Sequence, residues 1–365
     1  MSAHPRLAAA FAAAERYGAD GRDVVAAIVA GNEIVCRVGM AAPGAFHERG
    51  FHPTAICGVF GATAAVSRLA GFDAETATRA LGIAGSMASG IFAYLADGTP
   101  TKPIHPGWAA HGAHVATRLA HHGAAGPRSV FDAQFGIYHA YLGIEPGSSG
   151  LAEQLTDLGS RWETPRIAYK PFPICHFTHG AVGAAADAVE GRTFAPDEIA
   201  EVVVSVPEPW VPIVLEPAGE KKAPRSEYEG KFSLQYAVAS MLVRGHVGVT
   251  DFTEAAIADP DVLAVAAKVW HERGDFATYP EAFPGAARVV LASGKTFERM
   301  LPYQKGSPEN PWSADDVRAK FRANAGLALP AESAAALEEA ILAIDQLHDL
   351  TAALAPLTLQ EVATV

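Results

Sequence analysis

The chain has 365 residues, of which 50% are hydrophobic, 19% charged and 8% aromatic, and its formal net charge is −12. This composition excludes a disordered chain, which could not bury enough apolar surface to offset the entropy lost on ordering, and the length predicts two domains. The sequence has no basic run and no stretch of about 18 uncharged apolar residues free of Gly, Pro and His, so neither a nucleic-acid partner nor a membrane span is expected.

Apolar residues recur at helical spacing through the first part of the chain, where Ala and Gly are abundant. Because small side chains let helix backbones approach closely, we expect a closely packed helical domain. Asp73 is the expected N-cap of one helix, and Gly123 is the expected stop of another. The predicted helices cover about residues 7–17, 22–40, 53–70, 73–90 and 106–121.

The composition changes after about residue 162, where short β-branched segments occur. Residues 199–206 predict a strand, and residues 287–300 predict a hairpin that turns at Ser293-Gly294. Strands mixed with helices, without strict alternation, predict an α+β domain. The helices expected in it cover about residues 177–190, 231–243 and 253–269.

Helical patterns resume after a linker at residues 307–311. Ser313 opens the next helix with Asp316 three residues on, in the form of a capping box. The last helix, over about residues 331–355, is rich in Ala and Leu like the first domain, so we expect it to return there. The predicted fold class is therefore mainly α with a smaller α+β domain. Its expected parts are an all-helical domain of residues 1–162 and 310–365, and an α+β domain of residues 163–309.

Two further features bear on the cell compartment. The N-terminus lacks the charged-then-apolar layout of a signal peptide. The three cysteines, Cys36, Cys57 and Cys175, are odd in number and widely spaced, which argues against a disulfide framework. A cytoplasmic protein is therefore expected.

Histidine carries the clearest chemical pattern in the sequence. Common catalytic signatures are absent, whereas the dipeptides His4-Pro5, His52-Pro53 and His105-Pro106 each stand at the start of a predicted helix. Proline suits the first helical position, so each histidine is expected beside free backbone N–H groups and the positive end of the helix dipole, which favour anions.

Lys102 shortly precedes His105, and a lysine there would bind a carboxylate as a point charge. Since histidine supplies acid and base chemistry near neutral pH, the pattern favours proton transfer on a small carboxylate. The alternative is that each dipeptide only starts a helix and carries an exposed ring.

A metal site is a rival interpretation, because His111, His114 and His121 fall in one predicted helix, and the first two share a face. No carboxylate lies between Lys102 and His122 to complete a ligand set. The polar face of a packed helix is therefore favoured, and no metal ligand is assigned.

A further cluster, Cys175-His176-Phe177-Thr178-His179, could hold a Cys–His pair. A cysteine nucleophile needs a lowered thiol pKa, which sequence does not show. We expect a structural or substrate-contacting role for this cluster instead.

Five segments, read together and in this order, resemble the MmgE/PrpD family over nearly the whole chain. They are Gly50-Phe51-His52-Pro53-Thr54, residues 96–110 around Thr101-Lys102-Pro103 and His105-Pro106-Gly107-Trp108, Phe172-Pro173-Ile174-Cys175 with Thr178-His179, Gly230-Lys231-Phe232-Ser233-Leu234-Gln235-Tyr236, and Gly306-Ser307-Pro308-Glu309-Asn310-Pro311.

The resemblance implies a helical domain joined to a smaller α+β domain, and a homodimer that works without a cofactor. It assigns catalytic roles to His52, Lys102 and His4, with His4 as a second proton carrier. His105, Cys175 and His179 fall in matching motifs as substrate-binding residues.

The chain departs from the family pattern in two places. Family members carry a longer segment before the first His-Pro, where only three residues precede His4 here, so we expect a chain shortened at its start. Residues 206–210 also lack the tyrosine that the family's decarboxylase carries after the corresponding strand, which argues against decarboxylation.

The expected function is that of a cofactor-independent lyase, dehydratase-like, acting on a small di- or tricarboxylate such as 2-methylcitrate. The reaction would begin with proton abstraction α to a carboxylate. Two alternatives remain open: an epimerase of an iminodisuccinate-like dicarboxylate, which uses the same proton abstraction, and a non-catalytic truncated paralogue.

Overall fold

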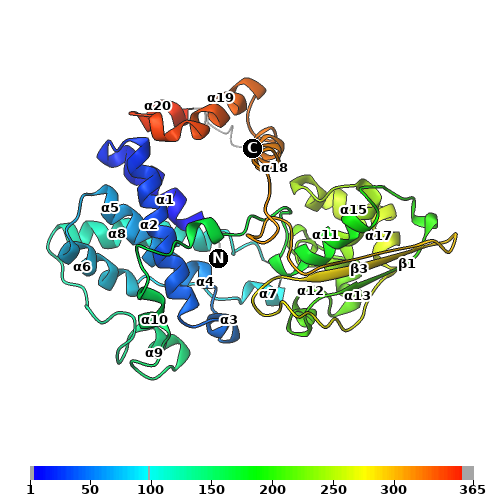
Figure 1. The fold of residues 1–365 in the computed structure, drawn as a ribbon, viewed down its shortest axis with the longest axis horizontal. Coiled ribbons are helices and arrows are strands. Elements are labelled where there is room, and N and C mark those ends of the chain that lie inside the picture. Colours follow the sequence, from blue (N-terminus) through cyan, green and yellow to red (C-terminus); the bar gives the residue numbers. More distant parts are fainter. Residues whose placement is uncertain (1–3, 98, 356–365) are drawn as a thin grey trace. The chain divides into compact units, whose positions relative to one another are not determined.

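The fold is taken from a computed structural model, which describes residues 4–97 and 99–355. The chain forms two compact units (Figure 1). The first unit extends to Ile167 and resumes at Phe321, and the second comprises Ala168–Lys320.

The first unit is helical. Its helices before the division are α1 (His4–Tyr17), α2 (Gly21–Met40), α3 (Ala45–Glu48), α4 (Pro53–Ile56), α5 (Gly58–Leu69), α6 (Ala74–Gly85), α7 (Tyr94–Asp97), α8 (Ile104–His121), α9 (Ile137–Leu142), α10 (Leu151–Leu155) and the 3-10 helix η1 (Thr164–Arg166). Its later part contains α19 (Ala331–Leu342), η6 (Ile344–Gln346) and α20 (Leu350–Leu354), and α18 (Ala314–Ala325) spans the division.

Close backbone approach holds the helices of the first unit together, as the Ala- and Gly-rich composition predicts. A Cβ placed on Gly31 of α2 would lie 2.7 Å from the carbonyl oxygen of Gly61 in α5, and one on Gly61 would lie 2.6 Å from that of Gly31. Only glycine fits at both positions. The predicted N-cap also forms, since the Thr76 N–H donates to Asp73 Oδ1 at 2.8 Å.

The C-terminal helices return to the first unit, which confirms the expectation for the last helix. The Gly21 N–H donates to the carbonyl oxygen of Leu347 at 2.8 Å. Leu350 of α20 is buried in one apolar cluster with Ala14 of α1 and Val24 of α2.

The second unit contains a four-stranded sheet in the order β2-β1-β3-β4, which makes it α+β as predicted. The strands are β1 (Ile199–Ser205), β2 (Val269–His271), β3 (Gly285–Leu291) and β4 (Thr296–Leu301). Its helices are η2 (His176–Thr178), α11 (His179–Ala188), η3 (Pro196–Glu198), η4 (Glu208–Trp210), α12 (Val211–Val214), α13 (Ala218–Lys222), α14 (Glu227–Gly230), α15 (Leu234–Arg244), η5 (Val249–Phe252), α16 (Glu254–Ile257) and α17 (Pro260–Ala266).

The sheet is mixed. Strand β1 pairs parallel with β2 and antiparallel with β3, and β3 pairs antiparallel with β4 through the predicted turn, where Gly294 has a φ of +83°. Helix α11 packs directly on β3, because a Cβ on Gly180 would lie 2.7 Å from the amide nitrogen of Gly285.

The predicted helix 73–90 ends at Gly85, and three more predicted helices are wrong in their extent. The predicted helix 253–269 is two short helices, and its last residue, Val269, begins β2. Pro260 supplies no backbone N–H, so the first helix stops before it and a new one starts there, with Asp259 as N-cap. Predicted helix 53–70 is interrupted at Cys57, and 331–355 is interrupted between α19 and α20.

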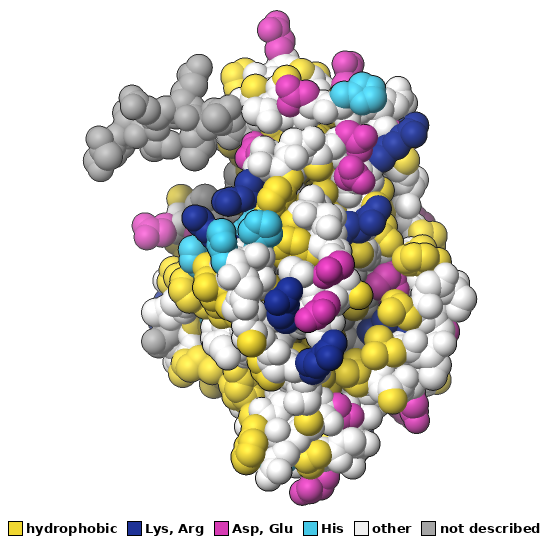
Figure 2. Space-filling view, turned by 90° about the vertical axis from the view of Figure 1, so that its left-hand side faces the viewer, with side chains coloured by type: hydrophobic (Ala, Val, Ile, Leu, Met, Phe, Trp, Pro, Cys, Tyr) yellow, Lys and Arg dark blue, Asp and Glu magenta, His cyan; other side chains and the backbone are white. Residues whose placement is uncertain are grey.

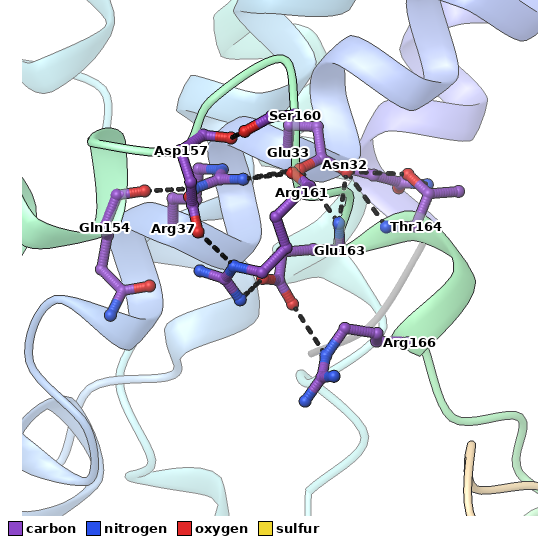
Figure 3. A network of polar contacts seen from close by, with 10 residues as sticks. All are labelled: Asn32, Glu33, Arg37, Gln154, Asp157, Ser160, Arg161, Glu163, Thr164 and Arg166. Atoms are coloured by element: carbon purple, nitrogen blue, oxygen red, sulfur yellow. Dashed lines mark hydrogen bonds and ion pairs between the residues drawn. The ribbon is translucent and has the colours of Figure 1, made fainter.

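A network of ion pairs and hydrogen bonds around the buried Arg37 and Glu33 attaches residues 154–166 to α2 (Figure 3). Arg37, fully buried, donates to Asp157 Oδ1 at 2.6 Å and to the carbonyl oxygen of Arg161 at 2.6 Å. One turn earlier, Glu33 accepts hydrogen bonds from the backbone N–H groups of Glu163, at 2.8 Å, and Thr164, at 3.0 Å. Hydrogen bonds from Arg161 and Arg37 lower the pKa of Asp157 to about 2.

The surface of the helical unit carries charges of both signs. Figure 2 shows lysine and arginine side chains interspersed with aspartate and glutamate and with apolar side chains on this face, and most of the visible histidines gathered at one place. Within the described part of the chain, every helix is too short or too polar to cross a membrane.

Candidate active site

The three His-Pro dipeptides lie at the starts of helices, as predicted. His4 begins α1, His52 is the N-cap of α4, and His105 lies in the first turn of α8, whose N-cap is Pro103. The start of α1 is close to α5 and α8, because a Cβ on Gly58 would lie 2.9 Å from Pro5 Cγ and 3.7 Å from Ala109 Cβ. The side chain of His4 lies outside the described residues.

A short backbone pairing brings His52 and His105 together. Phe51 forms an antiparallel bridge with Ile91, and the His52 N–H donates to the carbonyl oxygen of Gly90 at 3.0 Å. Gly90 has a φ of +132°, and a Cβ there would lie 3.2 Å from His105 Nδ1. The glycine backbone therefore lies against both histidines.

The Nδ1 atoms of His52 and His105 are 2.9 Å apart, a hydrogen-bond distance. In the neutral pair one ring carries the proton at Nδ1, which leaves its Nε2 as a base. The other ring must then carry its proton at Nε2, which makes that atom a donor. The pair therefore offers one proton acceptor and one proton donor, and it can store one extra proton.

Burial and a nearby cation favour the neutral form of His105. His52 is buried, at 8% exposure, and His105 is partly buried. Burial lowers the pKa of His105, and the charge of Lys102 lowers it further. The structure thus brings together His52, His105 and Lys102, three of the predicted site residues.

Aromatic rings surround the pair. The ring of Phe92 lies 5.5 Å from that of His52 and 5.4 Å from that of His47, and the ring of Tyr94 lies 5.7 Å from that of His105. These contacts fix the orientation of the imidazoles. His47, Gly90, Phe92 and Tyr94 are missing from the sequence prediction; the repeated Gly-x-Phe and aromatic spacing around residues 44–51 and 90–94 is the signal that could have located them.

The second unit holds Cys175 and His179, the other two predicted site residues. Cys175 is the N-cap of η2 and is buried, and its N–H donates to the carbonyl oxygen of Lys231 at 2.8 Å. His179 begins α11 at 1% exposure, with its Nε2 3.4 Å from the carbonyl oxygen of Ile174 and its Nδ1 without a hydrogen-bond partner. Burial, with the nearby His176, lowers the pKa of His179 well below its ordinary value.

His176 belongs to the same sequence cluster but was not assigned as a site residue, and its ring is more accessible than that of His179. Its Nε2 lies 2.5 Å from Nε2 of the buried Gln304, and its ring stacks on Phe283 with centroids 4.1 Å apart. The ring of His179 lies 5.3 Å away. The cluster therefore places one partly exposed imidazole in front of one that is fully buried.

The histidines of α8 do not converge on a common point. His111 stacks on Trp108 with ring centroids 5.3 Å apart, and His121 stacks on Phe72 at 5.8 Å. Among the described residues, no group of three His, Cys, Asp or Glu side chains is arranged to hold a metal ion.

Two domain models of one protein family match most of the chain. Residues 2–148 match the MmgE/PrpD N-terminal domain, and residues 172–346 match the MmgE/PrpD C-terminal domain.

Three relatives are similar to this chain. A cis-aconitate decarboxylase of Mus musculus is 31% identical over 82% of this chain and 60% of its own length, and one of Homo sapiens is 30% identical over 82% and 61%. A cis-aconitate decarboxylase-like protein of Aspergillus oryzae is 28% identical over 97% of this chain and 76% of its own length. The chain thus spans about 60% of the length of its mouse and human relatives.

Proposed function

Because this chain belongs to the MmgE/PrpD family, we propose that it is a lyase that acts on a small tricarboxylate of the cis-aconitate type. The observation that carries the proposal is the His52–His105 pair, with Nδ1 atoms 2.9 Å apart and the charge of Lys102 acting on it. A proton donor, a proton acceptor and a cation are the groups that such a reaction needs.

Decarboxylation of cis-aconitate is the first candidate reaction, because the named relatives are cis-aconitate decarboxylases or like them. When the bond to the departing CO2 breaks, its electron pair forms a new double bond. The electrons of the former double bond then move to a carbon next to a carboxylate, which takes up a proton. An Nε2–H of the protonated His52–His105 pair would supply that proton, and Lys102 would stabilise the charge on the carboxylate oxygens.

Dehydration of 2-methylcitrate is the second candidate, favoured by the absence of the decarboxylase tyrosine. After β1 the chain has Trp210, which is buried and stacks on Phe177 with centroids 4.8 Å apart. In this reaction the unprotonated Nε2 of the His52–His105 pair would remove a proton α to a carboxylate. The C–O bond would then break, and the leaving hydroxyl would take a proton and depart as water.

His4, Cys175 and His179 keep in this proposal the roles that the family resemblance implies: a second proton carrier and two substrate contacts. A homodimer is proposed on the same ground, and light scattering of the purified chain measures it.

The test is turnover of cis-aconitate, 2-methylcitrate and iminodisuccinate by the purified chain, followed by NMR so that loss of CO2, loss of water and epimerisation are told apart. We expect His52→Ala and Lys102→Ala each to lower the rate at least 100-fold. Removal of an acid–base group or of a charge-stabilising group typically costs about 100-fold or more. The matched control is His111→Ala, a histidine of α8 that stacks on Trp108. No turnover of any of the three acids would refute the proposal and favour the non-catalytic alternative.

A further inference from the structure

A second histidine-bearing turn leads directly into the His52–His105 pair. Helix α3 carries His47, and the Gly50 N–H that follows it donates to the carbonyl oxygen of His47 at 2.9 Å. Phe46 is buried, and the Phe51 N–H donates to its carbonyl oxygen at 2.8 Å. The buried Phe46 and these backbone hydrogen bonds therefore hold the turn in place, while His47 itself is exposed.

Phe92 joins this exposed histidine to the pair. The imidazole of His47 stacks on Phe92 with centroids 5.4 Å apart and planes inclined by 27°, and the ring of His52 contacts the same Phe92 at 5.5 Å. One phenyl ring thus sets the positions of two imidazoles that the chain places five residues apart.

The charge of Lys102 affects the imidazoles of both His47 and His105. The protein atoms packed around the imidazole of His47 lower its pKa although part of the residue stays exposed, and the charge of Lys102 lowers it further, as it does for His105. The charge of Lys102 therefore opposes a positive charge on either imidazole, and a bound anion would relieve that repulsion.

We propose that His47 binds a second carboxylate of the substrate, beside the carboxylate that Lys102 binds. The inference rests on the proposed function, and it makes the site selective for acids with two carboxylates held on the same side. A carboxylate at His47 would accept a hydrogen bond from the protonated ring, a charge-assisted contact that a monocarboxylate already held at Lys102 does not make.

The test compares two probes by calorimetry, in a buffer free of carboxylate and phosphate. Maleate presents two carboxylates on one side of a double bond, and crotonate presents one. We expect His47→Gln to weaken maleate binding about tenfold, the effect of losing one charge-assisted hydrogen bond, and to leave crotonate binding unchanged. For the preferred substrate, KM should rise while kcat changes little.

The matched control is His121→Gln, which removes a histidine stacked on Phe72 of the same unit and should alter neither probe. His47→Lys keeps a cation and should restore most of the maleate affinity. Equal binding of maleate by His47→Gln and the unsubstituted chain would overturn the inference, as would equal weakening of both probes or no binding of maleate by the unsubstituted chain.

These outcomes separate the two proposals. Selective loss of maleate binding in a chain that turns over none of the three acids would leave the inference standing and refute the proposed lyase. Turnover of one of the three acids together with unchanged maleate binding by His47→Gln would support the proposed lyase and refute the inference about His47.

Discussion

The imidazole of His105 lies against a backbone segment that has no room for a side chain. A Cβ on Gly90 would lie 2.6 Å from Ala55 Cβ and 3.2 Å from His105 Nδ1, and the φ of +132° is itself unfavourable for any other residue. Gly90 therefore sets the position of the ring, and through its carbonyl oxygen it also holds the backbone of His52.

We expect Gly90→Ala to displace His105 from His52 and to lower kcat/KM at least tenfold, with a loss of about 1–3 kcal/mol in the free energy of unfolding from overpacking. Gly107→Ala is the control, because Gly107 is in the same helix as His105 and a Cβ there has no neighbour within 4 Å. Steady-state kinetics and urea unfolding measure both effects. Full activity of Gly90→Ala would show that the ring position does not depend on this glycine.

His179 predicts how stability responds to acid. Its folded-state pKa lies well below the ordinary value of 6.5, because the ring is buried. Below about pH 6.5 the unfolded chain therefore binds a proton that the folded chain does not, and the free energy of unfolding falls as the pH is lowered.

Between pH 7.5 and 5.5 this one group should lower the free energy of unfolding by about 1 kcal/mol. His179→Leu should reduce that pH dependence relative to the unsubstituted chain. Urea unfolding at the two pH values gives the comparison. An unchanged pH dependence in His179→Leu would mean that the buried ring does protonate in the folded chain.

At the scale of elements, the network around Arg37 holds residues 154–166 in place through side-chain hydrogen bonds, where other parts of the chain rely on backbone hydrogen bonds of helices and strands. It joins α2 to a segment that contains little helix, because the buried side chains of Arg37 and Glu33 bond to Asp157 and to backbone groups of residues 161–164. The segment directly precedes the end of the first unit's continuous part at Ile167.

Removing one member of such a buried set is costly, since the remaining charges stay buried without their partner. We expect Arg37→Met to lower the free energy of unfolding by about 3–5 kcal/mol. Arg322→Met is the control, because Arg322 makes a comparable two-contact pair with Glu338 at 2.7 and 2.8 Å while its side chain is 68% exposed. That variant should change stability by under 1 kcal/mol. Similar losses in the two variants would contradict a special role for burial.

Local signals in the sequence were sufficient for the elements that depend on local chemistry. The caps at Asp73 and Ser313 and the turn at Gly294 form as predicted, because each depends on residues within three or four positions. Strand β2 was missed because Val269 ends an apolar helical pattern, and only its pairing with Val202 makes it a strand.

The residues of the site could be predicted from the sequence, whereas the way in which they contact one another could not. His52, Lys102 and His105 follow from the His-Pro pattern and the family resemblance. Their contact depends on the bridge between Phe51 and Ile91, forty positions apart, which no local pattern specifies. The Arg37 network was missed for the same reason, since Glu33 and Arg37 resemble an ordinary helical ion pair at i,i+4 spacing.

At the scale of the whole molecule, the first unit is closed by residues from both ends of its interrupted chain. A Cβ on Gly21 would lie 1.6 Å from the carbonyl oxygen of Ile344. Gly21→Ala should therefore push η6 off α2, break the hydrogen bond to Leu347, and expose residues 321–354 to proteases. Gly219→Ala, where a Cβ has no neighbour within 4 Å, is the control. Limited proteolysis with mass spectrometry locates the cuts, and identical digestion patterns would contradict the prediction.

This closure has a consequence for the order in which the protein is made. Translation completes Ala168–Lys320, a continuous segment with its own apolar core, before it reaches the residues that cover Ala14 and Val24. The second unit therefore has all its parts while the first still exposes the surface that Leu350 will cover. A ribosome stalled near Lys320 should carry a folded second unit and a first unit that still binds chaperones.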